Sequence, residues 1–399
     1  MQRMLRRATP KYAVIQGLYW AIYCLMVSFA SAFLLDRGFT NSSIGLILGL
    51  SYLFSAILQP IAGALFSRRR LRLNRAVACV YMPVALIALA ILTLPIPNGL
   101  LAVLMAIMFT VQSMMQPSVN ALSQAMESED DRINFGLARG VGSACYALSS
   151  FVMGRLLTRF APSILPGAYG VAVIVLILVL LSVRTTVSQG GVSVARRDDS
   201  YFGILREHPR LGLFLIGIAC MFLTYSFIDS FLLQILQSIG GTSANLGTAI
   251  TLSAMTELPA MILFSRLSRR GLGLKLYMGS IWFWLAKDLL TFLAPSPQVL
   301  YVVQLLNFAS CAVYVPGMLI YMRQTLPEAQ LLRGVTLAGT ATTLGSLAAT
   351  LMGGWLMDAA GVRAALGIVQ IFAIAGSVLL TLALWSAVRS KQSGDTPRE

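Results

Sequence analysis

Long apolar blocks separated by short polar segments make up most of this chain of 399 residues. Each block holds about 20 residues or more, which is the length at which an α-helix crosses roughly 30 Å of hydrocarbon. The pattern therefore predicts an all-α membrane protein. Twelve blocks predict twelve transmembrane helices, at about residues 12–35, 42–66, 76–96, 99–126, 135–158, 166–183, 211–236, 243–265, 274–293, 299–322, 334–357 and 364–388.

Landmarks of the first half of the sequence recur in the second half at nearly one offset. Pro60 and Pro259 are 199 positions apart, and Pro117 and Pro316 are again 199 positions apart. Such repetition is typical of transporters built from two six-helix halves, whose solute site lies between the halves near the middle of the membrane. We therefore predict two pseudo-symmetric six-helix bundles, at residues 1–186 and 208–399, with a cytoplasmic linker at 187–207 and a short disordered tail at the C-terminus.

Charged residues are scarce and unevenly placed along the chain. Only 11% of the residues are charged, against about 25% in soluble domains. The net charge of +15 comes mainly from arginine and lysine at the N-terminus, in alternate loops and in the C-terminal tail. This is the positive-inside pattern, and it predicts a multi-pass protein of the cell inner membrane with both termini in the cytoplasm. The basic excess is thus a topology signal with some attraction to anionic lipid, and we expect no nucleic-acid partner.

The sequence offers few of the residue patterns that enzymes use. The five cysteines lie scattered inside apolar blocks without a CxxC motif, and His208 is the only histidine. No Ser-His-Asp set, glycine-rich phosphate loop or metal-ligand spacing occurs in the sequence. We therefore expect no enzyme activity, no metal and no cofactor. The expected protein is a monomer whose partners are the lipid bilayer, a small solute and protons.

Three charged residues lie inside apolar blocks of the second half, namely Asp229, Glu257 and Lys287. A charge at the bilayer centre costs about 2.5–3.5 kcal/mol on insertion scales, so such groups usually face a water-filled path or one another. Burial disfavours the charged form of a carboxyl group, which lets the group load and release a proton near neutral pH. We expect Glu257 and Asp229 to couple transport to protons. Asp229 and Lys287 could instead form a structural charge pair, and the role of Asp288 stays open.

Polar residues of the first half gather in two blocks. Gln112, Gln116 and Asn120 are spaced by four residues, which predicts that the three amides share one helix face. Arg139 lies about one turn inside the block at 135–158. An amide face beside a buried arginine suits a solute with hydroxyl groups or a carboxylate, because arginine offers forked donors and amides both donate and accept. The alternative is that Arg139 snorkels to the membrane surface.

Several segments resemble the lactose permease branch of the major facilitator superfamily, the oligosaccharide:proton symporters, and the related phenylpropionate-permease-like group. FLLDRGFTNSSIG, LFSAILQPIAGALFS and NFGLARGVGSACYAL are similar to the helix 1–2 turn, helix 2 and helix 5 of that branch. TYSFID, SAMTELP and FWLAKD are similar to its helices 7, 8 and 9. The resemblance covers nearly the whole chain and implies the major facilitator fold. It also implies a substrate-binding Arg139, a stacking Tyr146 and a Glu257 that contacts substrate and takes part in coupling, and it aligns Asp229 and Lys287 with charged residues of helices 7 and 9.

Other positions depart from the charged residues of that branch. Its helix 4 acid is matched by Asn120. Its helix 10 lysine, histidine and glutamate are matched by Gln304, Asn307 and Ser310. A second helix 7 acid and the helix 11 lysine paired with it are matched by Ser226 and Gly345, so these two charges are neutralised together and leave no orphan charge. The resemblance therefore implies a proton relay that is shorter than that of the branch.

These patterns together predict a secondary active transporter that moves a small polar solute by alternating access. Proton-coupled import of a sugar, a glycoside or a small organic acid is the expected activity. The expected substrate-binding residues are Arg139, Asn120, Gln116 and Tyr146 in the first half, and Glu257, Asn307 and Gln304 in the second half. Two alternatives remain open: proton-driven efflux of a sugar or drug-like solute, and a membrane receptor or scaffold that kept the fold and lost transport.

Overall fold

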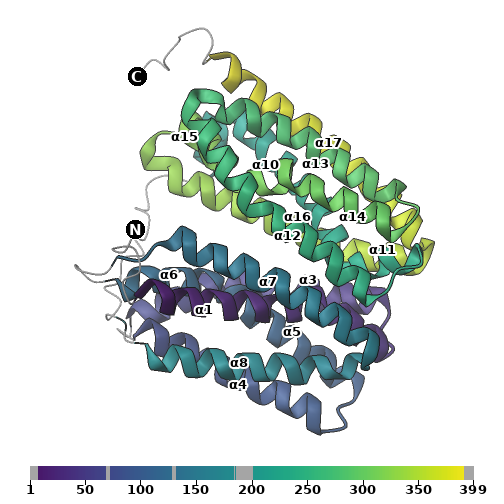
Figure 1. Cartoon of the computed structure of the whole chain (residues 1–399). Helices are drawn as coiled ribbons and strands as arrows, with labels where there is room; N and C mark the ends of the chain where they lie inside the picture. The colour runs from purple at the N-terminus through teal and green to yellow at the C-terminus, as the bar shows by residue number, and fades with distance from the viewer. Residues whose placement is uncertain (1–7, 69–71, 128–131, 184, 186–200, 391–399) are drawn as a thin grey trace. The chain divides into compact units, whose positions relative to one another are not determined.

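The computed structural model describes residues 8–68, 72–127, 132–183, 185 and 201–390, and helices make up nearly all of these residues (Figure 1). No β-strand occurs in these ranges, so the all-α prediction is confirmed. The predicted linker residues 187–200 and the tail at 391–399 lie outside the described residues. The linker and the disordered tail therefore stay predictions.

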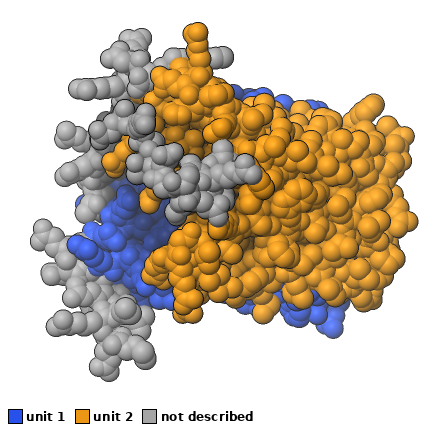
Figure 2. Space-filling view, turned by 90° about the horizontal axis from the view of Figure 1, so that it is seen from above, with its two compact units in different colours: residues 1–194, 241–254 blue, residues 195–240, 255–399 orange. Residues whose placement is uncertain are grey.

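The chain divides into two compact units, which Figure 2 shows in separate colours. Unit 1 comprises residues 1–194 and 241–254, and unit 2 comprises residues 195–240 and 255–399. Helix α12 (Ser243–Leu267) contributes its first half to unit 1 and its second half to unit 2.

The other elements of unit 1 come from the first half of the sequence. They are α1 (Ala8–Tyr23), the π-helical segment η2 (Cys24–Ser28), α2 (Ala30–Asp36), α3 (Asn41–Arg68), α4 (Leu73–Thr93), α5 (Asn98–Met114), α6 (Gln116–Met126), α7 (Phe135–Arg159), the 3₁₀ segment η3 (Pro162–Ile164) and α8 (Leu165–Ser182).

The other elements of unit 2 come from the second half. They are α9 (Tyr201–Glu207), α10 (Pro209–Ser230), α11 (Leu232–Ser238), the π-helical segment η4 (Ser268–Leu272), α13 (Gly273–Leu293), α14 (Pro297–Leu305), the 3₁₀ segments η5 (Leu306–Ala309) and η6 (Cys311–Val313), α15 (Tyr314–Thr325), α16 (Glu328–Ala360) and α17 (Val362–Ser390).

Ten helical segments among the described residues are long and apolar enough to cross a membrane. The two apolar blocks predicted at 243–265 and 274–293 fall within one such segment, residues 243–293, because η4 continues the helix between them. Helix α7 is not among the ten, since its glycines, serines and arginines lower its mean hydropathy. The structure thus confirms several membrane-length helices, while the number of twelve stays a prediction.

Four membrane-length segments are interrupted, at matching positions of the two sequence halves. In unit 1 the breaks lie between α1 and α2 and between α5 and α6, and in unit 2 between α10 and α11 and between α14 and α15. Pro117 and Pro316 lie in the first turn of the helix after two of these breaks, as expected for a residue without an amide donor. Matching interruptions in the halves of a transporter point to the solute pathway, because the freed backbone groups and side chains can line a cavity.

Large apolar side chains remain exposed along the helices of both units. Leu86, Ile371 and Trp355 are 66%, 64% and 63% exposed. Water-soluble proteins seldom expose apolar surface on this scale. The exposed side chains are the surface expected against lipid hydrocarbon, where burial of apolar groups between helices brings no hydrophobic gain.

Helix contacts are closest where glycine replaces a side chain. On α16, Gly345 faces the carbonyl oxygen of Ala219 on α10 so tightly that a Cβ atom would not fit. On α7, Gly142 faces the ring of Trp20 on α1, where a Cβ atom would lie 2.6 Å from Trp20 Cδ1. Small residues permit such approaches in membrane helices. The α1–α7 contact brings the polar residues of unit 1 together.

Candidate functional site

Arg139 lies one turn inside α7, and its guanidinium group is directed along the helix away from the N-terminal end. Its Cζ atom lies 3.9 Å from the centroid of the Trp20 ring on α1. Its Nη1 atom donates a hydrogen bond of 2.8 Å to Ser143 Oγ, which lies one further turn into α7. A snorkelling arginine would turn its head group to the surface. The observed placement instead puts a cation against an aromatic face inside the helix bundle.

Gln16 of α1 connects the Arg139–Trp20 contact to α6. Its Oε1 atom accepts a hydrogen bond of 3.0 Å from Trp20 Nε1, and its Nε2 atom donates to Asn120 Oδ1 at 3.1 Å and to the Tyr12 hydroxyl at 2.6 Å. Gln16 itself is fully buried. Gln16 was not predicted as a site residue from the sequence, although an amide spaced by four residues from both Tyr12 and Trp20 in an apolar block is a detectable signal.

Tyr146 of α7 also contacts the Trp20 ring. The two ring centroids are 6.3 Å apart with an interplanar angle of 78°, an edge-to-face arrangement. The Tyr146 hydroxyl is 2.9 Å from Ser28 Oγ in η2. The π-helical turn of η2 therefore holds a hydroxyl group next to the aromatic pair, which is consistent with the frequent occurrence of such turns at functional sites.

The predicted amide face of Gln112, Gln116 and Asn120 crosses Met115, where α5 ends and α6 begins. Gln112 is fully buried, and its Oε1 atom accepts hydrogen bonds from Tyr81 at 3.2 Å and from Tyr169 at 3.5 Å. Gln112 also meets α1, because its Nε2 atom donates to the carbonyl oxygen of Tyr19 at 3.5 Å, and Asn120 meets α1 at Gln16. Two of the three amides thus contact the same helix, while Gln116 is half-buried at the start of α6. One face shared by all three amides stays a prediction.

Lys287 of α13 is a buried base of unit 2. Its Nζ atom donates a hydrogen bond of 3.2 Å to Asn307 Oδ1 in η5. Lys287 and Asn307 are 7% and 3% exposed. Lys287 also acts electrostatically on Asp229 of α10, although no ion pair between the two occurs among the described residues. The ammonium group thus links α13 to the interrupted segment that contains η5.

The remaining polar groups of unit 2 differ in burial. Glu257 of α12 and Asp229 are partly exposed, whereas Gln304 and Ser310 are 4% and 0% exposed. The thiol of Cys311 interacts electrostatically with Lys287, Glu257 and Asp229, so these three charged groups lie near η6. The place of Cys311 in this cluster was not predicted from the sequence.

Ser226 and Ser346 form a hydroxyl pair where the resembling branch has opposite charges nearby. Their Oγ atoms are 2.6 Å apart and join α10 to α16. The close approach of Gly345 to α10 leaves no room for a lysine side chain at that position. The structure thus accommodates the loss of both charges through a neutral hydrogen bond and a tighter helix contact.

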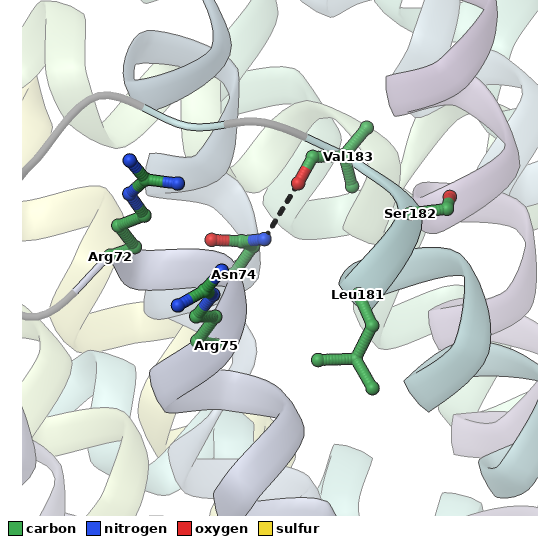
Figure 3. Close-up of a pocket in the computed structure, with 6 residues that line it drawn as sticks. All are labelled: Arg72, Asn74, Arg75, Leu181, Ser182 and Val183. Atoms are coloured by element: carbon green, nitrogen blue, oxygen red, sulfur yellow. Dashed lines mark hydrogen bonds between the residues drawn. The ribbon is translucent and has the colours of Figure 1, made fainter.

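A separate cavity of about 360 Å³ lies at one end of unit 1 (Figure 3). It is lined by the ends of α4 and α8, with Arg72 and Arg75 on one side. Asn74 donates hydrogen bonds of 2.9 Å and 2.8 Å to the carbonyl oxygens of Leu180 and Val183, which fixes the two helix ends together. This cavity contains none of the predicted site residues.

Comparisons with known proteins agree with this architecture. Residues 11–368 match the family described as MFS_1 like family. Maltose permease of Geobacillus stearothermophilus is 24% identical over 357 residues, which cover 89% of this chain and 88% of the permease.

Solved structures show the same fold at low identity. A mutant of the nucleoside transporter NupG superposes with a TM-score of 0.78 at 13% identity, covering 96% of this chain and 100% of the NupG chain. A bacterial homolog of the human lysosomal transporter Spinster gives a TM-score of 0.67 at 13% identity, covering 96% of this chain and 97% of the homolog. Because the family match spans most of the sequence, the chain belongs to the MFS_1 like family and is a multi-pass major facilitator transporter rather than an enzyme.

Proposed function

We propose that the chain is a proton-coupled importer of a small solute that carries a sugar ring, such as a sugar or glycoside. The observation that carries this proposal is the network of Arg139, Trp20, Gln16 and Asn120 in unit 1. An aromatic face can stack on the apolar face of a sugar ring, while forked guanidinium donors and amides bind its hydroxyl groups. Binding pockets for small molecules typically combine such aromatic surface with a few convergent polar groups.

The names of the relatives support the same class of solute. The curated relative is a maltose permease and one structural neighbour is a nucleoside transporter. Maltose and nucleosides both contain sugar rings with free hydroxyl groups. A solute of this kind is therefore the first to be tested on this chain.

Each unit contributes one set of residues to the proposed activity. The solute is bound in unit 1 by Arg139, Asn120, Gln116 and Tyr146, and in unit 2 by Glu257, Gln304 and Asn307. Glu257 and Asp229 couple transport to protons, because they are the partly exposed acids of the membrane-spanning part of unit 2. The protein works as a monomer in the cell inner membrane, with both termini in the cytoplasm.

A two-stage experiment tests the proposal. Thermal-shift measurements on the purified protein at pH 6 and pH 8 first screen maltose, other glycosides, nucleosides and aromatic acids, the last because guanidinium groups bind carboxylates through two parallel hydrogen bonds. Uptake of the stabilising solute into proteoliposomes is then measured with and without an imposed proton gradient. Glu257→Gln should abolish gradient-driven accumulation, while Asp36→Asn, at the exposed end of α2, should leave it unchanged.

The alternatives give different outcomes in the same assay. Efflux would appear as gradient-driven export from preloaded vesicles without accumulation inside. A receptor would bind the solute without moving it under any gradient. If the proton gradient has no effect on solute movement, or if Glu257→Gln accumulates solute as well as the wild type, proton-coupled import is refuted.

A further inference from the structure

Asp288 of α13 is the most deeply buried acid among the described membrane-spanning residues. It is 2% exposed, and its Oδ2 atom has no hydrogen-bond partner in the described part of the chain. Asp229 and Glu257 of unit 2 are partly exposed by comparison. An ionised carboxylate in such a place is costly unless it is paired and hydrogen-bonded. The group therefore needs either a cationic partner or a proton.

Lys287 precedes Asp288 in the chain but is already engaged elsewhere. Its Nζ atom donates to Asn307 Oδ1 at 3.2 Å, and its charge acts on Asp229 as well as on Asp288. Neighbouring side chains on a helix point about 100° apart, so the ammonium group and the Asp288 carboxyl group leave α13 in different directions. One ammonium group cannot neutralise both aspartates at once.

Gln370 of α17 presents a second buried acceptor without a partner. It is 5% exposed, its Nε2 atom donates to the carbonyl oxygen of Leu366 at 3.3 Å, and its Oε1 atom has no hydrogen-bond partner among the described residues. Helix α17 packs directly against α13 (Figure 1). Asp288 Oδ2 and Gln370 Oε1 are thus two buried acceptors on helices in contact, and both lack a hydrogen-bond donor among the described residues.

The register of the two helices places these acceptors at the same level. Gly367 of α17 contacts the Phe292 ring of α13, with a built Cβ atom 3.3 Å from the ring. Successive spans alternate in direction, so α13 and α17, three spans apart, run antiparallel. Asp288 lies four residues before Phe292, and Gln370 lies three residues after Gly367, so each lies about one helical turn from the Gly367–Phe292 contact and on the same helix face as its contact residue. Because the two helices are antiparallel, one turn back along α13 and one turn forward along α17 lead in the same direction.

We propose that Asp288 is a proton-binding site, and that in this state its protonated carboxyl group donates a hydrogen bond to Gln370 Oε1. One proton then removes the charge of Asp288 and supplies the donor that Gln370 lacks. When the proton leaves to water, the resulting carboxylate draws on Lys287, which is the charged group that acts on it. Lys287 must then weaken its hydrogen bond to Asn307 or its electrostatic attraction to Asp229, so proton loss loosens the link of α13 to η5 or to α10.

Few other titratable groups lie on the elements that pack against α13. Besides Asp288, Asp229 and Lys287 are the charged residues of these elements and of α13 that lie away from the helix ends in the described ranges. Three arginines near the helix ends are exposed: Arg210 at the start of α10, Arg323 in the last turn of α15 and Arg363 in the first turn of α17. Arg269 and Arg270 lie in η4 at the start of α13. The other titratable groups in the spans of these elements are Cys220 and Tyr225 of α10, Tyr301 of α14, Cys311 of η6, and Tyr314 and Tyr321 of α15. For the transport cycle, the inference rests on the proposed proton coupling: it adds Asp288 as a buried proton-binding site to the coupling residues Glu257 and Asp229.

Infrared spectroscopy of the full-length protein in lipid nanodiscs tests the proposal without any solute. At neutral pH the wild type should show the C=O stretching band of a protonated carboxyl group, with a shift in D₂O. Asp288→Asn should remove the band, and Gln370→Leu should move it because the hydrogen bond is lost. Asp229→Asn and the exposed control Asp36→Asn should retain it. Asp288→Glu, which keeps a carboxyl group, should retain a shifted band if Asp288→Asn does not fold.

Three results would overturn the proposal: no such band in the wild type, a band that survives in Asp288→Asn, or a band that disappears in Glu257→Gln instead. Loss of the band on adding sodium at constant pH would also overturn it, by showing that the buried acceptors bind a metal cation. The band and the uptake assay fail independently. If Asp288 carries the proton and no solute accumulates in proteoliposomes, the proton site stands and the proposed transport function falls.

Discussion

Replacing Gly142 with alanine tests whether the contact between α1 and α7 sets the geometry of the unit 1 site. The new Cβ atom would lie 2.6 Å from Cδ1 and 3.3 Å from Cγ and Nε1 of Trp20. The ring must withdraw by about 0.8 Å to reach an ordinary contact of 3.4 Å. The same ring lies 3.9 Å from Arg139 Cζ and donates its 3.0 Å hydrogen bond to Gln16. Both interactions are therefore strained by one added methyl group.

The expected cost follows from these contacts. Overpacking costs about 1–3 kcal/mol, and a cation–π contact contributes about 0.5–2 kcal/mol. If about 1.4 kcal/mol of this cost destabilises the solute-bound protein relative to the free protein, the Kd rises about tenfold. This Kd is that of the solute selected by the thermal-shift screen. Calorimetric titration measures Kd, and thermal unfolding of the same sample measures Tm, which should also fall.

Gly136→Ala is the matched control for this prediction. Gly136 lies on the same helix, is exposed, and a Cβ atom there meets only Asn134 Oδ1, at 3.6 Å. We expect its Kd and Tm to stay at the wild-type values or to improve slightly, since alanine favours helix over glycine. Equal Kd values for the two variants would refute the reasoning that the Trp20 position determines solute affinity.

Three further predictions concern single interactions. Arg139→Lys should raise Kd for the solute more than tenfold in calorimetric titration, because an ammonium group lacks the planar fork that stacks on Trp20; an unchanged Kd would remove Arg139 from the site. Asn307→Leu should lower the free energy of unfolding by about 1.5–3 kcal/mol, measured by thermal unfolding, because the Lys287 ammonium group loses its acceptor. Adding Lys287→Met should restore most of this loss, and failure of that rescue would show that altered packing causes the effect. Asn74→Ala should destabilise the protein by about 1–3 kcal/mol, because two carbonyl oxygens at the end of α8 lose the donor Asn74. The Kd for the solute should not change, and a higher Kd would link the cavity beside Arg72 and Arg75 to solute binding.

Much of the fold could be predicted because the relevant signals are local. The apolar blocks had to become helices, since backbone groups in hydrocarbon can be satisfied only within the helix itself or in a closed barrel. The breaks were harder to foresee. Pro117 and Pro316 mark two of them, but the π-helical turn of η2 and the break at Phe231 contain neither proline nor glycine. These breaks depend on neighbouring helices rather than on the residues at the break.

The sequence by itself determined that this protein spans a membrane with helices. It also determined that a few charged residues within these helices need partners or water, because the cost of a charge in hydrocarbon does not depend on the fold. Which groups accommodate them was decided by the tertiary structure. Gln16 meets Asn120 across 104 residues, and Lys287 meets Asn307 rather than a carboxylate. Such contacts depend on how each helix is rotated, where it is interrupted and how closely a glycine lets its neighbour approach. None of these can be read from the spacing of residues along one helix.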